Sequence, residues 1–304
     1  MNEMRKDFEE HGYVIVPSIL DKDEVIKFRT VLEDVFNSDI DPKKGDRKLI
    51  RNDVLSRYPD IQDLFFQEKI FKEVKKILGK KIIILPEVSV MESQFGGWHK
   101  DTTSVEVFGY DFHKKKDFNM VNLAIYLQDN DEFGGGLDVV PRSHLELDPY
   151  TKPLMEVYAK HESQFFLKKY FYKFYQKILT KFAPSALDKN GDEARVENFE
   201  NIKLDAEDDK KNKTRIQNKA GDMVIFDLRL DHKATWPKKK LTIGNHKPKY
   251  ALFAILAGER VSAEKYKDYI LSRASKEYEY QYLFDMKANK SLKAQAKKFN
   301  AELI

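Results

Sequence analysis

The chain has 304 residues, of which 41% are hydrophobic and 34% charged, which is ordinary for a globular protein and long enough to bury a large core. The 54 basic and 50 acidic residues nearly cancel, so the net charge of +4 does not by itself call for nucleic acid or an anionic membrane. Cysteine is absent, which excludes disulfides, thiolate nucleophiles, Fe–S clusters and Cys-ligated zinc. No apolar run is long enough to span a membrane and the N-terminus has no signal-peptide core, so we expect a soluble, cytoplasmic protein.

Residues 1–80 are predicted to form N-terminal helices and one short strand. Gly12 can take the left-handed conformation that ends a helix. Asp21 and Glu24 have the spacing of a capping box, with Asp in place of the usual Ser or Thr. The helices are expected up to residue 12, over 21–36 and over 61–78, and the strand over 13–16.

Short segments rich in apolar and β-branched residues predict the strands of the core. Loops rather than regular helices separate most of them, which argues against a doubly wound sheet and favours an antiparallel sandwich or barrel. We assign this core to residues 81–144 and 219–257. The strands are expected over 81–85, 88–95, 120–127, 137–140, 222–227 and 249–256.

A long insert, residues 145–218, divides the core, and helices are expected over residues 258–304. Within the insert, aromatic and aliphatic residues between 167 and 182 form an apolar helical stripe. This stripe is expected to pack on the core, with a lid or a dimer face as the functional alternatives. We expect residues 1–304 to form a single domain.

His99 and Asp101 form the pattern His-x-Asp, which puts two potential metal ligands one residue apart. On a strand both side chains point to the same face, so both could reach one ion. His232 follows a buried apolar strand, where an imidazole without a partner would be costly. Two histidines and one carboxylate make the facial triad of non-haem Fe(II) oxygenases, which leaves open positions on the metal.

The His-x-Asp pattern is not specific on its own, because a similar pair, His144 and Glu146, occurs in the same chain. We expect His144 to hold its loop by hydrogen bonding and Glu146 to be solvated. The alternative for His99 and Asp101 is a surface pair on a strand. The alternative for His232 is a core histidine with its hydrogen bonds satisfied.

Four segments, in this order, resemble the phytanoyl-CoA dioxygenase (PhyH) family of Fe(II)- and 2-oxoglutarate-dependent oxygenases. They are FEEHGYVIVP at residues 8–17, WHKD at 98–101, GGGLDVVPRSH at 134–144 and GDMVIFD followed by a histidine at 221–232. The resemblance spans roughly residues 5–257. It implies a mainly β fold with flanking helices, built on a double-stranded β-helix core of the jelly-roll or cupin type.

The resemblance implies a dioxygenase that uses Fe(II) and 2-oxoglutarate to hydroxylate its substrate, with release of succinate and CO2. Carried over residue by residue, it makes His99, Asp101 and His232 the iron ligands. The family's cosubstrate-binding arginine is Lys249 here, which keeps the positive charge but loses the planar two-pronged fork. Arg229 is the fallback cation for 2-oxoglutarate.

Four further residues are candidates for the site. Gln94 and Asn122 lie on predicted strands that could flank the metal and hold 2-oxoglutarate, with ordinary core or surface amides as the alternative. Thr102 and Thr103 adjoin the metal motif and could contact the substrate. Arg142 stands where the family has a glycine, which could alter that loop.

The expected partners are O2 and a small-molecule substrate, with no nucleic acid, no membrane span and a homodimer as an option. Lysine runs at 114–116 and 238–240 could attract a phosphorylated, nucleotide-linked or CoA-linked substrate. Three alternatives to the dioxygenase stay open. They are a non-catalytic jelly-roll that binds a ligand, an oxygenase fold that has kept iron but lost 2-oxoglutarate, and a nucleic-acid binder, against which the small net charge argues.

Overall fold

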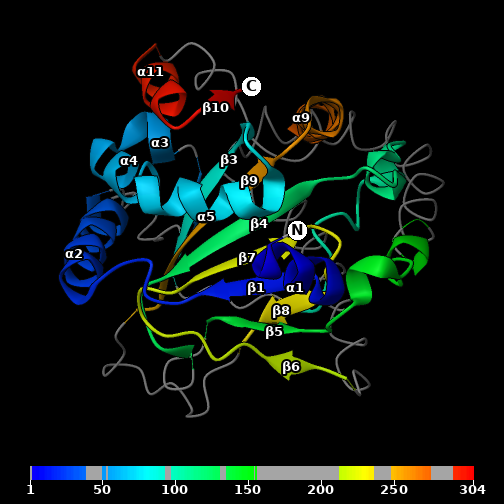
Figure 1. Cartoon of the computed structure of the whole chain (residues 1–304), viewed down its shortest axis with the longest axis horizontal. Coiled ribbons are helices and arrows are strands. Elements are labelled where there is room, and N and C mark those ends of the chain that lie inside the picture. Colours follow the sequence, from blue (N-terminus) through cyan, green and yellow to red (C-terminus); the bar gives the residue numbers. More distant parts are fainter. Residues whose placement is uncertain are drawn as a thin grey trace, which may run out of the picture.

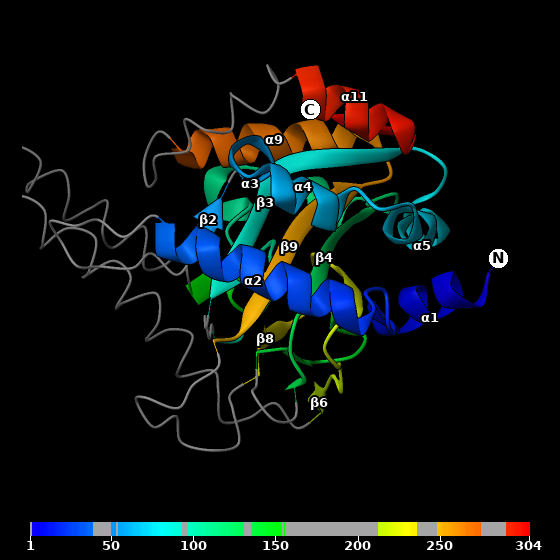
Figure 2. The ribbon, with the colours of Figure 1, turned by 90° about the vertical axis from the view of Figure 1, so that its left-hand side faces the viewer.

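Two β-sheets pack against each other, and helices cover the outer face of the larger sheet (Figures 1 and 2). The computed structural model describes residues 2–38, 50–52, 54–92, 97–130, 135–153, 155, 212–235, 248–274 and 290–304. No helix within these ranges is long and apolar enough to cross a membrane.

The larger sheet has the strand order β1-β7-β4-β9-β3-β10, and β2 also pairs with β3. All its pairings are antiparallel except that of β10 with β3. Every residue of β4 and β7 is buried, because these central strands are covered on both faces. The strands are β1 Tyr13–Val16, β2 Ile50–Asn52, β3 Ile82–Glu92, β4 Met120–Tyr126, β7 Met223–Asp227, β9 Tyr250–Ala257 and β10 Ala301–Leu303.

The smaller sheet consists of β6 (Thr214–Arg215), β5 (Leu137–Val139) and β8 (His232–Ala234), in that order. β6 falls in the last part of the predicted insert, yet it pairs with β5, and Arg215 donates a hydrogen bond of 3.0 Å to Asp138. A hydrophobic cluster joins the two sheets. It includes Ala124, Tyr126, Leu137, Val139, Val224, Phe226 and Ala251.

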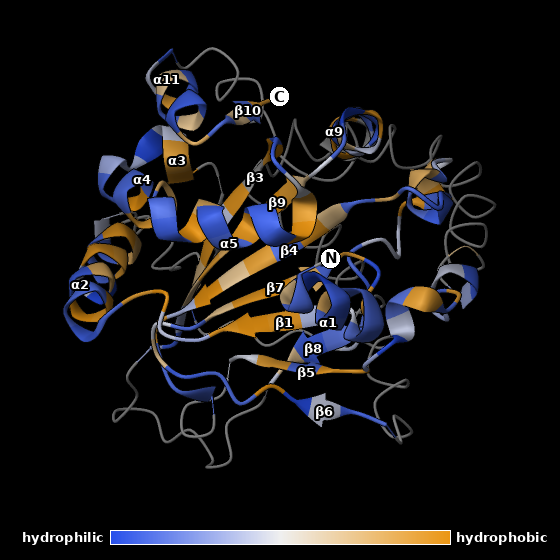
Figure 3. Ribbon diagram, in the orientation of Figure 1, coloured by the Kyte–Doolittle hydropathy of each residue, from blue (hydrophilic) through white to orange (hydrophobic). Residues whose placement is uncertain are grey.

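The helices bury their apolar sides on the larger sheet and present polar residues outward (Figure 3). The N-terminal set is α1 (Glu3–His11), α2 (Lys22–Ser38), α3 (Val54–Arg57), α4 (Pro59–Phe65) and α5 (Glu68–Leu78). The C-terminal helices α9 (Arg260–Ala274) and α11 (Lys290–Lys298) lie toward the β3–β10 edge of the sheet (Figure 1).

Two local predictions at the N-terminus are confirmed. The capping box closes in both directions, since Glu24 N–H donates to Asp21 Oδ1 at 2.9 Å and Asp21 N–H donates to Glu24 Oε2 at 2.8 Å. Gly12 ends α1 in the left-handed conformation, with φ at 84°. A Cβ at this position would also lie 2.5 Å from Nδ1 of His144, so both backbone and packing require glycine.

Three elements were predicted wrongly, and the first is at the C-terminus, where residues 301–303 form strand β10 rather than part of a helix. The helix expected over 61–78 is broken into α4 and α5 at Phe66, whose backbone is not helical (φ −85°, ψ 69°) and whose ring stacks on that of Phe71 with centroids 5.9 Å apart. The strands expected on either side of Pro86 are one strand, β3, whose register against β9 shifts between Ile84 and Val88. Proline lacks the N–H that a regular ladder of hydrogen bonds between strands needs, so the pairing of β3 with β9 is irregular at this point.

Some predicted features lie outside the described residues. They are the apolar stripe between 167 and 182, the lysine run at 238–240 and the candidate Gln94. These predictions therefore stand as they were made from the sequence.

The loop that carries Arg142 gives a testable prediction about stability. Arg142 has φ of 70°, a left-handed conformation that costs a residue with a Cβ roughly 1–2 kcal/mol. We expect Arg142→Gly to raise the free energy of unfolding in urea by about 1 kcal/mol, because glycine adopts this conformation without that cost. The backbone N–H of residue 142, which donates to His11 O at 3.0 Å, is kept. An equal gain from Arg142→Ala, which keeps the Cβ, would contradict this explanation.

Candidate metal centre

The backbone joins the two histidines of the predicted metal site. His99 and His232 form an isolated antiparallel bridge, in which each N–H donates to the other residue's C=O at 2.9 Å. On its other side, His232 is opposite Val139 of β5. Two segments far apart in the sequence are therefore held in register at the edge of the smaller sheet.

Both imidazole rings are oriented in the same way. Nδ1 of His99 lies 2.8 Å from Gly97 O, and Nδ1 of His232 lies 2.9 Å from Leu230 O. A carbonyl can only accept, so a proton on each Nδ1 satisfies these contacts and leaves a lone pair on each Nε2. This is the usual way in which a protein fixes the tautomer of a metal-binding histidine.

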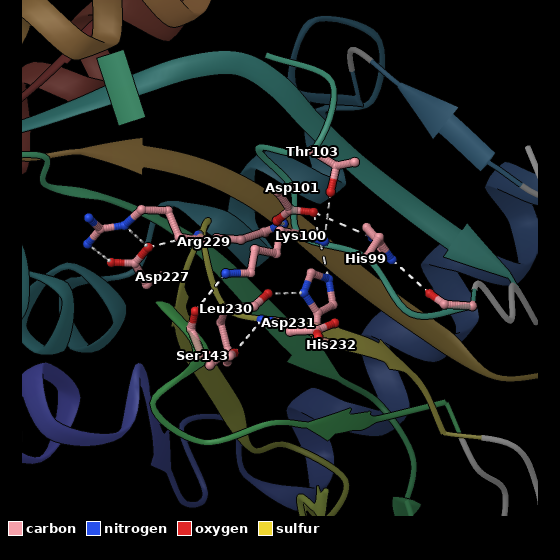
Figure 4. Close-up of polar contacts among 12 residues, drawn as sticks. His99, Lys100, Asp101, Thr103, Ser143, Asp227, Arg229, Leu230, Asp231 and His232 are labelled. Atoms are coloured by element: carbon pink, nitrogen blue, oxygen red, sulfur yellow. Dashed lines mark hydrogen bonds and ion pairs between the residues drawn. The ribbon is translucent and has the colours of Figure 1, made fainter. Parts of the chain in front are cut away.

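Asp101 completes a cluster of three ligand atoms (Figure 4). Its Oδ1 lies 3.6 Å from Nε2 of His99 and 3.7 Å from Nε2 of His232. Nitrogen and oxygen ligands lie roughly 2.0–2.2 Å from a bound metal, so two ligands of one ion are at most about 4.4 Å apart. The two distances from Asp101 therefore fit one shared ion, and the ligand atoms of all three residues lie within 4.8 Å of one another. Asp101 lies in a turn rather than on a strand, which corrects the strand geometry assumed from the sequence.

The electrostatics of the cluster suit a cation. Burial, followed by the neighbouring His99, lowers the pKa of His232 to about 4, so this imidazole is neutral at pH 7. Burial tends to raise the pKa of Asp101, but His232, His99 and Asn122 outweigh it and lower that pKa to about 2. Within the described residues, the cluster thus offers a neutral imidazole and a carboxylate, the protonation states that metal binding requires.

Asn122 holds the carboxylate of Asp101. It lies on β4, is buried, and donates from Nδ2 to Asp101 Oδ2 at 3.0 Å. Its Oδ1 is buried and has no hydrogen-bond partner among the described residues. From the sequence we expected Asn122 to lie near the metal and to bind the cosubstrate. In the structure it is hydrogen-bonded to Asp101, a candidate metal ligand.

The segment from 143 to 150 ties the two ligand segments together. Lys100 Nζ donates to Ser143 O at 2.6 Å and to Glu146 O at 2.9 Å. Ser143 Oγ accepts from the N–H of Asp231 at 2.8 Å, and Tyr150 Oη donates to the Asp231 carboxylate at 2.9 Å. Lys100, next to Asp101, and Asp231, next to His232, are thus both bound by residues of this one segment (Figure 4). His144, in the same segment, has Nε2 3.2 Å from Glu9 O, which agrees with its predicted loop-holding role.

Lys249 is buried immediately before β9, and its side chain lies against the backbone of Gly135. A Cβ on Gly135 would come within 1.8 Å of Lys249 Cδ, so a side chain at this position would displace the lysine. Burial lowers the pKa of Lys249 to about 7. A buried amine in this state gains strongly from a bound anion.

Tyr126 is a candidate that the sequence analysis missed. It lies on β4 four residues after Asn122 and opposite Ala251, two residues from Lys249. Its hydroxyl is buried and has no hydrogen-bond partner among the described residues, and burial raises its pKa. The alternation of side chains along residues 120–127 could have identified it, because Asn122 and Tyr126 share one face of the strand.

The remaining candidates are placed differently. Arg229 extends away from the three ligands, donates to both carboxylate oxygens of Asp227 at 2.9 and 2.7 Å and lies over the ring of Phe118 (Figure 4). Thr103 Oγ1 accepts from the N–H of Lys100 at 3.1 Å, which closes a local turn. Thr102 Oγ1 is buried without a partner in the described part of the chain.

A family model described as phytanoyl-CoA dioxygenase (PhyH) matches residues 8–236 of the chain. No curated protein matches the sequence. HygX from Streptomyces hygroscopicus, with nickel and 2-oxoglutarate bound, is 16% identical with a TM-score of 0.54, and the match covers 84% of this chain and 87% of HygX. EctD from S. alaskensis, with 2-oxoglutarate and 5-hydroxyectoine, is 13% identical with a TM-score of 0.52, and the match covers 84% of this chain and 76% of EctD. These likenesses confirm the predicted fold.

Proposed function

Because the chain belongs to the phytanoyl-CoA dioxygenase family, we propose that it hydroxylates a small-molecule or carrier-linked substrate, with release of succinate and CO2. Family membership makes it an oxygenase-type enzyme that depends on Fe(II) and 2-oxoglutarate. The observation that carries the proposal is the convergence of the ligand atoms of His99, Asp101 and His232 within 4.8 Å of one another.

The donor set fits Fe(II). Two imidazoles and one carboxylate, without any thiolate, are the ligands of non-haem iron oxygenases and leave positions open. When bound, Fe(II) supplies the redox chemistry that couples oxidative decarboxylation of 2-oxoglutarate to oxidation of the substrate. His99 and His232 would bind it through Nε2, and Asp101 would bind it through a carboxylate that Asn122 orients.

We assign the far carboxylate of 2-oxoglutarate to Lys249 and Tyr126. Asn122 at the metal cluster and Tyr126 share one face of β4 and lie roughly 13 Å apart along the strand at about 3.3 Å per residue. A long lysine side chain and an extended dicarboxylate can together cover that distance. The tyrosine hydroxyl and the lysine ammonium would supply the two donors that one arginine fork supplies in the family.

The pKa of Lys249 predicts the pH dependence of cosubstrate binding. Before 2-oxoglutarate binds, burial holds the pKa of Lys249 at about 7, and the carboxylate raises that pKa in the complex, so binding takes up a proton above pH 7. We expect the Kd for 2-oxoglutarate to rise by up to about tenfold per pH unit above 7 and to be flat below it. Calorimetry between pH 6 and 9 measures this. Lys249→Arg, which stays charged, should give a flat profile, and a flat profile for the wild type would contradict the assignment.

The substrate is proposed only by class. Thr102 is the candidate contact, because its buried hydroxyl has no partner among the described residues. The proposal of a phosphorylated, nucleotide-linked or CoA-linked substrate rests on the lysine runs, and Lys114 of the first run is paired with Glu106 at 2.6 Å. A homodimer is likewise a proposal from the aromatic stripe in the sequence.

Formation of succinate tests the function. The protein is incubated with Fe(II), 2-oxoglutarate and O2 without a further substrate, and succinate is measured against His99→Ala and the exposed-site control His11→Ala. We expect slow formation by the wild type and by His11→Ala and none by His99→Ala. Iron binding without succinate would favour an oxygenase fold that has lost its cosubstrate. Absence of both would favour a non-catalytic jelly-roll.

A further inference from the structure

We propose that Arg29 of helix α2 is a positioning residue that fixes Lys249 for the cosubstrate. The inference rests on the proposed function, in which Lys249 binds the far carboxylate of 2-oxoglutarate. Arg29 is partly exposed on the helical face of the larger sheet and is not a member of the metal cluster. Its contacts nevertheless converge on the residues that flank Lys249.

The guanidinium of Arg29 joins the ends of two neighbouring strands. It donates from Nη1 to Leu127 O and from Nη2 to Pro248 O, both at 2.8 Å. Leu127 directly follows β4, and Pro248 directly precedes Lys249. One planar group therefore holds the exit of β4 and the entry to β9 at a fixed separation, which a single ammonium would do less rigidly.

The residue on the other side of Lys249 is also fixed by α2. The ring of Tyr250 stacks on Phe36 with centroids 5.7 Å apart and planes at 11°, and Arg29 Cζ lies 5.2 Å from the same ring. Arg29 and Phe36 are seven residues apart, so they lie on the same face of the helix. The N–H of Tyr250 also donates to Gln128 Oε1 at 2.8 Å. Both neighbours of Lys249 are thus held from outside the site.

The large number of residues between His232 and Lys249 is consistent with such an anchor. Residues 236–247 separate the end of the described segment at Thr235 from Pro248, so the spacing between His232 and Lys249 is long. A lysine is a point charge on a flexible stem and does not orient itself on a carboxylate as an arginine fork does. Its ammonium therefore depends on a fixed backbone, which Arg29 supplies at Pro248.

The test compares binding of 2-oxoglutarate to Zn(II)-loaded protein by calorimetry, which does not require turnover. The variants are Arg29→Met, Arg29→Lys, Lys249→Met and the double variant Arg29→Met/Lys249→Met. Arg5→Met is the matched control, because Arg5 is an exposed helical arginine that pairs with Glu9. We expect Arg29→Met to raise the Kd for 2-oxoglutarate about tenfold, which is the usual size of the loss when a residue that supports a binding side chain is removed. Arg29→Lys should fall between Arg29→Met and the wild type, and Zn(II) affinity should be unchanged in all of them.

The double variant separates positioning from general destabilisation. If Arg29 acts through Lys249, the double variant binds 2-oxoglutarate no more weakly than Lys249→Met alone. The role of Arg29 would be overturned, and that of Lys249 left intact, by either of two results. One is a double variant whose Kd rises by the product of the two single-variant factors, and the other is an unchanged Kd in Arg29→Met. An unchanged Kd in Lys249→Met would overturn the cosubstrate assignment and the role of Arg29 with it.

Discussion

Replacing His232 by alanine is expected to weaken binding of a divalent metal by more than about 100-fold. Loss of a residue that only hydrogen-bonds to a metal ligand already lowers metal affinity by about 10–100-fold. The variant removes one of three ligand atoms, and its backbone bridge to His99 does not need the side chain. Calorimetric titration with Mn(II) or with anaerobic Fe(II) measures the effect. Oxygenase activity should disappear with the metal.

A graded variant shows whether this loss is specific. Asn122→Ala keeps all three ligands and removes only the hydrogen bond of 3.0 Å to Asp101, so we expect metal affinity to fall by about 10–100-fold. His11→Ala should bind as the wild type does. Metal affinity that His232→Ala leaves unchanged would show that the cluster is not the metal site.

The second large effect concerns Lys249. We expect Lys249→Met to raise the Kd for 2-oxoglutarate by about 100-fold, since breaking a buried ion pair costs about 3 kcal/mol or more and each 1.4 kcal/mol is tenfold. Tyr126→Phe, which removes one hydroxyl, should raise it by about tenfold. Titration of the metal-loaded protein measures both.

Pyruvate is the matched ligand for this prediction, because it keeps the 2-oxo acid group and lacks the far carboxylate. Its binding should be weak and should not change in Lys249→Met or Tyr126→Phe. If both variants weakened pyruvate and 2-oxoglutarate equally, Lys249 and Tyr126 would be supporting the fold rather than contacting the far carboxylate.

Local sequence signals predicted those parts of the fold in which a short segment decides its own structure. The capping box of Asp21 and Glu24, the left-handed Gly12 and the buried strand β4 are of this kind. The break at Phe66 was missed because apolar residues continue through residues 61–78, and that pattern does not report the contacts of the Phe66 ring with Phe71 and the distant Phe299. The strands β2, β6, β8 and β10 span only two or three residues, too short for alternation to be read.

For the site, too, the sequence predicted what local motifs determine and missed what distant contacts determine. The order of the motifs indicated that His99, Asp101 and His232 converge, and the structure brings their ligand atoms together, while their role as ligands stays a prediction. The environment of Lys249 depends on Arg29, more than two hundred residues away in the sequence, and no local pattern reports such a contact. Chance pairs such as His144 and Glu146 show why spacing alone is insufficient.

Anaerobic titration of the protein with Fe(II) in the presence of 2-oxoglutarate tests the central claim most directly, because the visible charge-transfer band requires the metal and the cosubstrate in one site. We predict a band that saturates at one Fe(II) per chain in the wild type and is absent in His99→Ala. A wild type without the band, or a band of full intensity in His99→Ala, would contradict the assignment of this cluster as the iron centre.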